Sequence, residues 1–283
     1  MELLLFVLLL ALTGVGAGLV GSLTGLGGAV VVIPVLLIAF STPFPEAAGT
    51  GLITVLATSS TTGAAYLRDR LTDLRIGMFL EVATVPGALL GATATIFLTH
   101  ANLDHALLIA LGGVLLATIP GAYRRRREGP SDAAGPDARS TRLGLNGSYV
   151  DESGRTIPYR AAHTTPALGV AFGAGLVSGM FGIGGGVFKV LSMEHYLRLP
   201  MKVATATSNF MIGVTGAAGA GVLLAAGYVD PLLAAPAALG TTAGALIGSR
   251  VFPGLRNQTV RFLFLPVIGA LAVEVILRGV GLS

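Results

Sequence analysis

Long apolar stretches, separated by short polar segments, run along nearly the whole chain. A helix that crosses the hydrocarbon core of a membrane needs about 20 apolar residues. Most of the stretches have this length, which predicts an all-α polytopic membrane protein. The first and fifth stretches are longer and contain glycine clusters, so each is expected to form two helices joined by a break, either broken or re-entrant in the membrane. The stretches comprise residues 2–40, 47–66, 74–99, 103–123, 166–194, 203–226, 231–252 and 258–277.

The first and fifth stretches are related in sequence. Residues 16–30 recur as residues 173–187 with nine of 15 positions identical, at an offset of 157 residues. The same offset pairs Thr50 with Thr207. Internal duplication in a very apolar chain is typical of secondary transporters. The chain is therefore expected to have three parts, which are a first transmembrane repeat (1–123), a polar linker (124–165) and a second transmembrane repeat (166–283).

Positive charge alternates between equivalent loops of the two repeats. Loop 67–73 is basic, whereas its partner 227–230 contains no Lys or Arg. Conversely, loop 41–46 contains none, whereas its partner region contains Arg198 and Lys202. Because basic loops stay in the cytoplasm, equivalent loops are expected to face opposite sides of the membrane, which is the signature of an inverted-topology repeat. Each repeat is then expected to contain five helical segments, with both chain termini outside.

The polar linker has features of its own. It opens with four consecutive arginines at 124–127, and its later part, 145–159, resembles a small β-hairpin with its turn at 151–154. Four arginines next to a membrane span place the linker in the cytoplasm. A nucleic-acid-binding patch is the alternative for this charge, and the flanking spans disfavour it.

Composition narrows the class further. Hydrophobic residues make up 53% of the chain and charged residues only 11%, against about 25% charged residues in soluble domains. The absence of cysteine excludes disulfides, thiolate metal sites and thiol catalysis. We expect no metal, no cofactor and no nucleic-acid partner; the expected partners are the lipid bilayer and a small anionic substrate. The N-terminal apolar run has no basic residue before it, so we interpret it as a membrane segment of a cytoplasmic-membrane protein rather than a signal peptide.

The two glycine clusters are the strongest candidates for a binding site. Glycine is a poor helix former, and an irregular backbone within a membrane is tolerated only where protein or a cavity surrounds it. A break leaves the next helix with free N–H groups that attract anions. The alternative is close helix packing, to which we assign Gly87, Gly91, Gly244 and Gly248. The candidate anion ligands are Gly25, Gly27 and Gly28 in the first repeat and Gly182, Gly184, Gly185 and Gly186 in the second.

Uncharged polar side chains within the apolar stretches add candidate hydrogen-bond donors. Thr50, Thr207, Ser208 and Asn209 carry hydroxyl or carboxamide groups, which bind oxyanions without adding a fixed charge. Hydrogen bonding between helices is the alternative role for each of them.

Lys189 is the most costly residue to place within a membrane. It lies just after the second glycine cluster. There it is expected to attract the anion or act in gating, to neutralise one of three glutamates (Glu81, Glu194 or Glu274), or to extend its ammonium to the membrane interface. Glu81 lies inside an apolar stretch and is a possible coupling residue, because burial favours the protonated form of a carboxylate.

These motifs together resemble the sulfite exporter TauE/SafE family. The resemblance covers residues 10–275 and is most specific at 182–190 and 202–214. It implies two related halves, each with a glycine-rich motif near its start, and movement of sulfite, sulfonates or related organosulfur anions across the cytoplasmic membrane. By this resemblance both glycine clusters fall on the family's motifs. The family often has a proline soon after the motif: Pro34 fits this pattern, but Leu191 stands at the equivalent position of the second repeat, so the second break is expected to differ in shape.

We therefore expect a secondary transporter that moves a small anion by alternating access, coupled to protons or another ion, and not an enzyme. The alternative function is a passive anion channel that uses the same glycine breaks. The sequence pattern assigns neither the substrate nor an oligomeric state.

Overall fold

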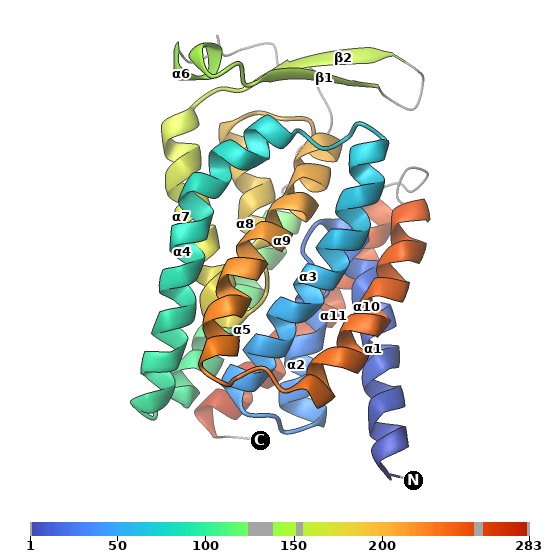
Figure 1. The fold of residues 1–283 in the computed structure, drawn as a ribbon, viewed down its shortest axis with the longest axis vertical. Coiled ribbons are helices and arrows are strands. Elements are labelled where there is room, and N and C mark those ends of the chain that lie inside the picture. Colours follow the sequence, from blue (N-terminus) through green and yellow to red (C-terminus); the bar gives the residue numbers. More distant parts are fainter. Residues whose placement is uncertain (1, 124–137, 151–154, 252–256, 282–283) are drawn as a thin grey trace.

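The computed structural model describes residues 2–123, 138–150, 155–251 and 257–281, in which long helices run side by side along one axis (Figure 1). The apolar stretches form these helices, and the polar segments form the turns between them. The first repeat comprises α1 (Glu2–Thr24), α2 (Ala29–Ala39), α3 (Phe44–Arg68), α4 (Leu74–His100) and α5 (Asp104–Tyr123). The second comprises α7 (Thr164–Phe181), α8 (Gly186–Leu191) with the π-helix η1 (Ser192–Tyr196), α9 (Met201–Ala225), α10 (Pro231–Val251) and α11 (Asn257–Val280).

Several of these helices suit a membrane. Among the described residues, α1, α4, α7, α9 and α10 are long and apolar enough to span one. Large apolar side chains point outward from them; Val82, Phe97 and Leu239 are 76%, 73% and 72% exposed. Apolar surface of this extent is unfavourable in water and favourable in lipid. The structure therefore agrees with an all-α membrane protein.

The packing between helices follows the sequence repeat. α1 packs against α10, and α4 packs against α7. At the offset of 157 residues, α1 is equivalent to α7 and α4 to α10, so these two contacts are copies of each other. Two further large contacts, α3 with α9 and α5 with α11, each join equivalent helices, and the contact of α3 with α10 is the copy of that of α9 with α4.

Glycines allow these helix pairs to approach closely. A Cβ atom at Gly87 would lie 2.4 Å from the carbonyl oxygen of Phe172, and one at Gly244 would lie 2.0 Å from that of Val15. At Gly91 and Gly248 an added Cβ would also collide with the partner helix. The packing role predicted for these four glycines is confirmed.

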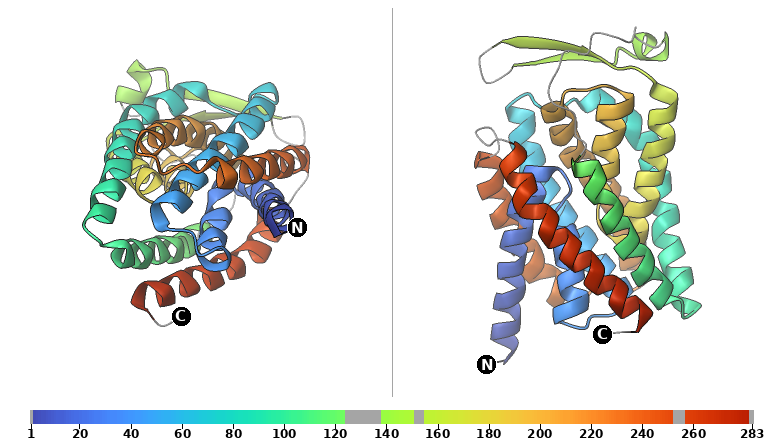
Figure 2. Two further views of the ribbon diagram at one scale, coloured as in Figure 1. Left: turned by 60° about the horizontal axis from the view of Figure 1, so that its bottom comes forward. Right: turned by 180° about the vertical axis from the view of Figure 1, so that it is seen from behind.

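The helices of the two halves lie side by side, and the two halves point in opposite directions along the long axis. α1 begins, and α11 finishes, at the end of the molecule opposite the β-hairpin, and equivalent helices of the two halves run in opposite directions (Figures 1 and 2). As a result, α1 and α2 form a hairpin that starts and finishes at the terminus end. The hairpin of α7 with α8 and η1 starts and finishes at the other end.

The linker contains α6 (Ala138–Arg142) and the strands β1 (Asn146–Val150) and β2 (Thr156–Arg160), which pair antiparallel. The predicted hairpin is present; the arginines at 124–127 and the turn at 151–154 lie outside the described residues. Tyr149 and Tyr159 are buried against the first turns of α4, where Ile76 lies. The Tyr159 hydroxyl donates to an Asp73 carboxylate oxygen at 2.8 Å. Burial and the Asp73 charge both raise the pKa of this phenol.

Candidate anion site

Both predicted helix breaks are present, and they have nearly the same backbone geometry. α1 ends at Thr24 before the first glycine cluster, and α7 ends at Phe181 before the second. Gly25 and Gly27 have φ angles of 73° and 78°, and the equivalent Gly182 and Gly184 have 75° and 77°. These left-handed conformations strain any residue with a Cβ atom, which explains the glycines.

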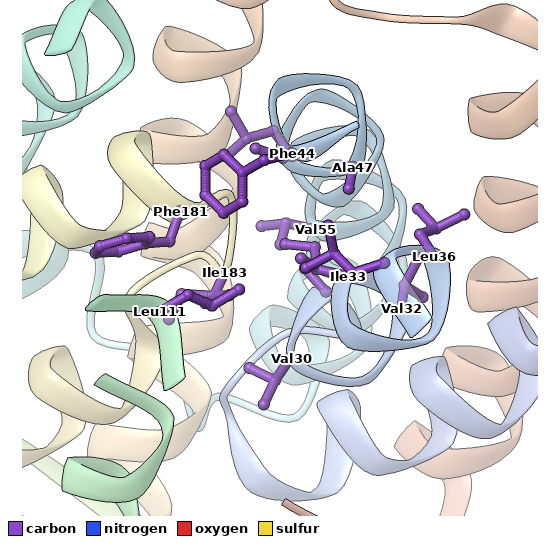
Figure 3. Packing of buried hydrophobic residues seen from close by; sticks show 14 of the residues in the cluster. Val30, Val32, Ile33, Leu36, Phe44, Ala47, Val55, Leu111, Phe181 and Ile183 are labelled. Atoms are coloured by element: carbon purple, nitrogen blue, oxygen red, sulfur yellow. The ribbon is translucent and has the colours of Figure 1, made fainter. Parts of the chain in front are cut away.

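The two breaks meet in the interior of the molecule. A Cβ atom at Gly186 would lie 2.2 Å from the carbonyl oxygen of Gly25, so the two breaks touch directly. Gly27 and Gly184 both face Val55 of α3 and Ile212 of α9, which are equivalent positions in the two repeats. Figure 3 shows Val55 beside Ile183 of the second break and Ile33 of α2.

Both breaks contain backbone N–H groups with no acceptor. Within the described residues, the amides of 26–28 and 183–185 donate to no carbonyl or side chain, and all six residues are buried. Buried N–H groups are nearly always paired. Each set also lies at the start of a helix, where the backbone dipole favours negative charge. The arrangement is therefore suited to holding a small anion from two sides.

Buried polar side chains without partners lie beside the same breaks. In the described part of the chain, Thr205 Oγ1, Ser178 Oγ and Asn209 Oδ1 have no hydrogen-bond partner. Thr205 contacts Gly25, and Ser178 contacts Gly185. Ser178 and Thr205 were not predicted as site residues, because a hydroxyl within an apolar stretch does not reveal which helix face the break occupies.

The predicted side-chain ligands have different surroundings. Ser208 Oγ donates to the carbonyls of Gly25 at 3.0 Å and Gly186 at 3.3 Å, so it ties the two breaks together. Asn209 Nδ2 donates to Thr205 O at 3.2 Å. Thr207 Oγ1 accepts from the Asp73 amide at 3.0 Å and thus faces the start of α4. The Thr50 hydroxyl is buried and, among the described residues, has no partner.

Lys189 forms an ion pair with Glu81 of α4. Its ammonium lies 3.6 Å from Glu81 Oε1, and the Lys189 side chain is 0% exposed. The ammonium also donates to the carbonyl of Met211 at 3.2 Å and to the hydroxyl of Thr215. Of the three glutamates considered as partners, the structure therefore selects Glu81.

Two threonines complete this charged cluster. Thr84 Oγ1 donates to Glu81 Oε2 at 2.7 Å, and Thr215 lies 2.9 Å from Glu81 Oε1. Neither threonine was predicted as part of the site. Thr84 follows Glu81 by three positions, a spacing that places two side chains on one helix face; Thr215 is brought there only by the packing of α4 on α9.

The helices that follow the two breaks differ in shape. α2 is a continuous helix of 11 residues that includes Pro34. α8 has six residues and then continues as the π-helix η1, which begins one residue after Leu191. The difference in shape expected from the missing proline is present.

Comparison with known proteins gives a consistent result. The family model described as "Sulfite exporter TauE/SafE" matches residues 10–275. The chain is 26% identical to "Probable membrane transporter protein YunE" of Bacillus subtilis (strain 168), covering 97% of this chain and 98% of that protein. It is also 26% identical to "Probable membrane transporter protein YdhB" of the same organism, with 91% and 93% covered. No solved structure gives a significant match.

Proposed function

Because this chain belongs to the sulfite exporter TauE/SafE family, we propose that it is a secondary transporter that carries a small oxyanion, such as sulfite or a sulfonate, across the cytoplasmic membrane. One observation carries the proposal. Two buried glycine breaks with unpaired amides meet between α3 and α9. Backbone donors of this kind bind a negatively charged group without a fixed counter-charge that would hold it too tightly.

The two halves form an inverted-topology repeat in this proposal. Two observations support this. The contact of α1 with α10 is repeated as the contact of α7 with α4, and equivalent helices of the two halves run in opposite directions (Figure 1). The basic residues Arg68, Arg75 and Lys202 stand at helix ends beside the β-hairpin. By the positive-inside rule this end is cytoplasmic, and both termini are outside. Alternating access then consists of one part of the helix bundle rocking against the rest around the paired breaks.

The Lys189–Glu81 pair supplies the charge coupling. Lys189 lies on the first turn of α8, so its ammonium raises the positive potential around the second break. Protonation of Glu81 would remove its attraction for Lys189 and leave the ammonium free to compensate an incoming anion. Anion binding and proton binding would therefore favour each other, which is the requirement for coupled transport.

The test uses the Asn209→Asp variant in proteoliposomes. This change keeps the size of the side chain and places a negative charge beside Thr205 and the first break, so saturable sulfite or sulfonate flux is expected to fall at least tenfold. Asn102→Asp, in an exposed turn, is the matched control. Unchanged flux in Asn209→Asp contradicts the assigned site. Flux in the parent that never saturates and ignores a proton gradient indicates a channel instead.

A further inference from the structure

A cavity lies at the end of the molecule that contains the termini, and no glycine of either break lines it. It is a cavity of about 250 Å³ between the end of α2, the loop before α3, the start of α5 and the end of α11. Its polar lining consists of Ser41, Thr42, Asp104 and Arg278, and its apolar lining includes Leu37 and Phe44.

Two opposite charges line this cavity without pairing. No ion pair joins Asp104 to Arg278 among the described residues, since their charged atoms are more than 4 Å apart. Arg278 donates to the carbonyls of Leu37 and Ile38, the latter at 2.9 Å, which fixes its position at the C-terminal end of α2. Its Nε and the Oδ1 atom of Asp104 have no hydrogen-bond partner in the described part of the chain.

This donor and acceptor set selects a particular ligand chemistry. The guanidinium suits a sulfonate or carboxylate group. The Asp104 carboxylate repels a plain anion, but it accepts a hydrogen bond from a ligand that also carries a donor. Leu37 and Phe44 provide apolar walls for a short carbon chain between the two groups. A volume of about 250 Å³ admits only a small solute.

The cavity also adjoins the second glycine break. Phe44 lines the cavity and packs edge-on against Phe181, with ring centroids 6.3 Å apart (Figure 3). Phe181 directly precedes Gly182. The two rings therefore stand between the cavity and the central site. The equivalent residues in the other half, Met201 and Thr24, are not aromatic.

We propose that this cavity is an outer binding station for small organic anions that carry a hydrogen-bond donor, with Arg278 binding the anionic group and Asp104 accepting from the donor. The station rests on the proposed function: it gives the transporter a preference for hydroxylated anions before they pass Phe44 and Phe181. Asp104 acts as the specificity-determining residue.

The test measures binding of two ligands that differ by one hydroxyl, 2-hydroxyethanesulfonate and ethanesulfonate, to the purified protein in nanodiscs. The parent is expected to prefer the hydroxylated ligand about tenfold, the value of one hydrogen bond to a charged group. In Asp104→Ala, binding of 2-hydroxyethanesulfonate should weaken and binding of ethanesulfonate should strengthen, because the acceptor and the repulsive charge are lost together. Asp69→Ala, at the opposite end of the molecule, is the control and should keep the parent preference.

Opposite shifts of the two affinities support the station, whereas an unchanged preference in Asp104→Ala overturns it. Arg278→Lys gives a second check: it retains the charge but loses the planar fork, and both ligands should bind several-fold more weakly. If Asp104→Ala leaves the preference unchanged while Asn209→Asp abolishes flux, the station is wrong and the central site stands. If Asp104→Ala shifts both affinities as expected while Asn209→Asp transports normally, the central site is wrong and the cavity remains a binding site.

Discussion

The two helix breaks and the short helices after them have the same backbone geometry at the glycines but differ in charge. The turns at Gly25–Gly27 and Gly182–Gly184 have matching φ angles, yet the residue one turn further is Val32 in α2 and Lys189 in α8. Glu81, the partner of Lys189, is likewise replaced by Ala238 at the equivalent position of the other repeat. The backbone donors are thus duplicated, while the ion pair exists once. In the proposed mechanism, both halves supply backbone donors to the anion, and the charged pair that couples transport to protons involves α8 but not α2.

Two further pairs of equivalent positions carry the same residue in both repeats but form different hydrogen bonds. Asp73 and Thr207 are equivalent to Asp230 and Thr50. The Asp73 amide donates to Thr207, and its carboxylate accepts from Tyr159 of the hairpin. The Thr50 hydroxyl has no partner among the described residues. The β-hairpin is therefore hydrogen-bonded to one end of the helix bundle. In the part of the chain described, the Thr50 hydroxyl at the other end forms no equivalent hydrogen bond.

The largest expected effect comes from breaking the ion pair. Lys189→Met leaves Glu81 charged in a buried site, which costs about 3–5 kcal/mol. The double variant Lys189→Met/Glu81→Gln removes both charges, so it should regain most of that stability while its flux no longer responds to a proton gradient. Unfolding in nanodiscs and proteoliposome flux measure the two effects. Val32→Met is the matched control, with a cost of about 1–3 kcal/mol for overpacking; if it matches Lys189→Met and the double variant regains nothing, the ion pair has no special role.

The next prediction tests whether the backbone N–H groups of both breaks bind the anion. Gly27→Ala and Gly184→Ala each force a Cβ atom into a left-handed conformation, at about 1–3 kcal/mol. Both should reduce substrate affinity to a similar degree, as measured by the concentration that half-saturates flux. Gly16→Ala and Gly173→Ala are the controls, since an added Cβ meets nothing within 4 Å at either position. Loss of affinity in only one of the two cluster variants would show that one break binds the anion alone.

The hydrogen bond from Tyr159 of the β-hairpin to Asp73 is expected to have a smaller effect on stability, and this effect depends on pH. Tyr159→Phe removes the bond to Asp73 and should destabilise the protein by about 1 kcal/mol at neutral pH. Because folding raises the pKa of this phenol, the parent binds more protons when folded and loses stability as the pH rises above the unfolded value of about 10. The difference in the free energy of unfolding between the parent and Tyr159→Phe should therefore become smaller above that pH, as measured by chemical unfolding. A constant gap across the alkaline range would mean that Tyr159 does not titrate with unfolding.

The smallest effect compares the two equivalent threonines. Thr207→Val removes the acceptor of the Asp73 amide and should cost about 1 kcal/mol. Thr50→Val removes a hydroxyl that has no hydrogen-bond partner among the residues described, so its effect on the free energy of unfolding should be near zero. Paired unfolding curves measure the difference. An equal loss of stability in both variants would indicate that the Thr50 and Thr207 hydroxyls contribute equally to the free energy of unfolding.

The sequence by itself determined the all-α membrane fold and the position of both helix breaks. Apolar stretches of membrane length, a constant offset between repeats and glycines clustered at two points are local properties that need no neighbouring helix to be read. Left-handed turns at Gly25 and Gly182 follow from the same local chemistry, because only glycine adopts them without strain.

Which polar groups meet depends on how the helices pack, and local sequence does not reveal it. Three glutamates were possible partners for Lys189, and the packing of α4, α8 and α9 selected Glu81 and added Thr215. Ser208 and Thr207 are neighbours in sequence, yet one ties the breaks together and the other contacts Asp73. The physical reason is that a helix sends successive side chains in different directions, so the partner of each is set by the helices packed around it.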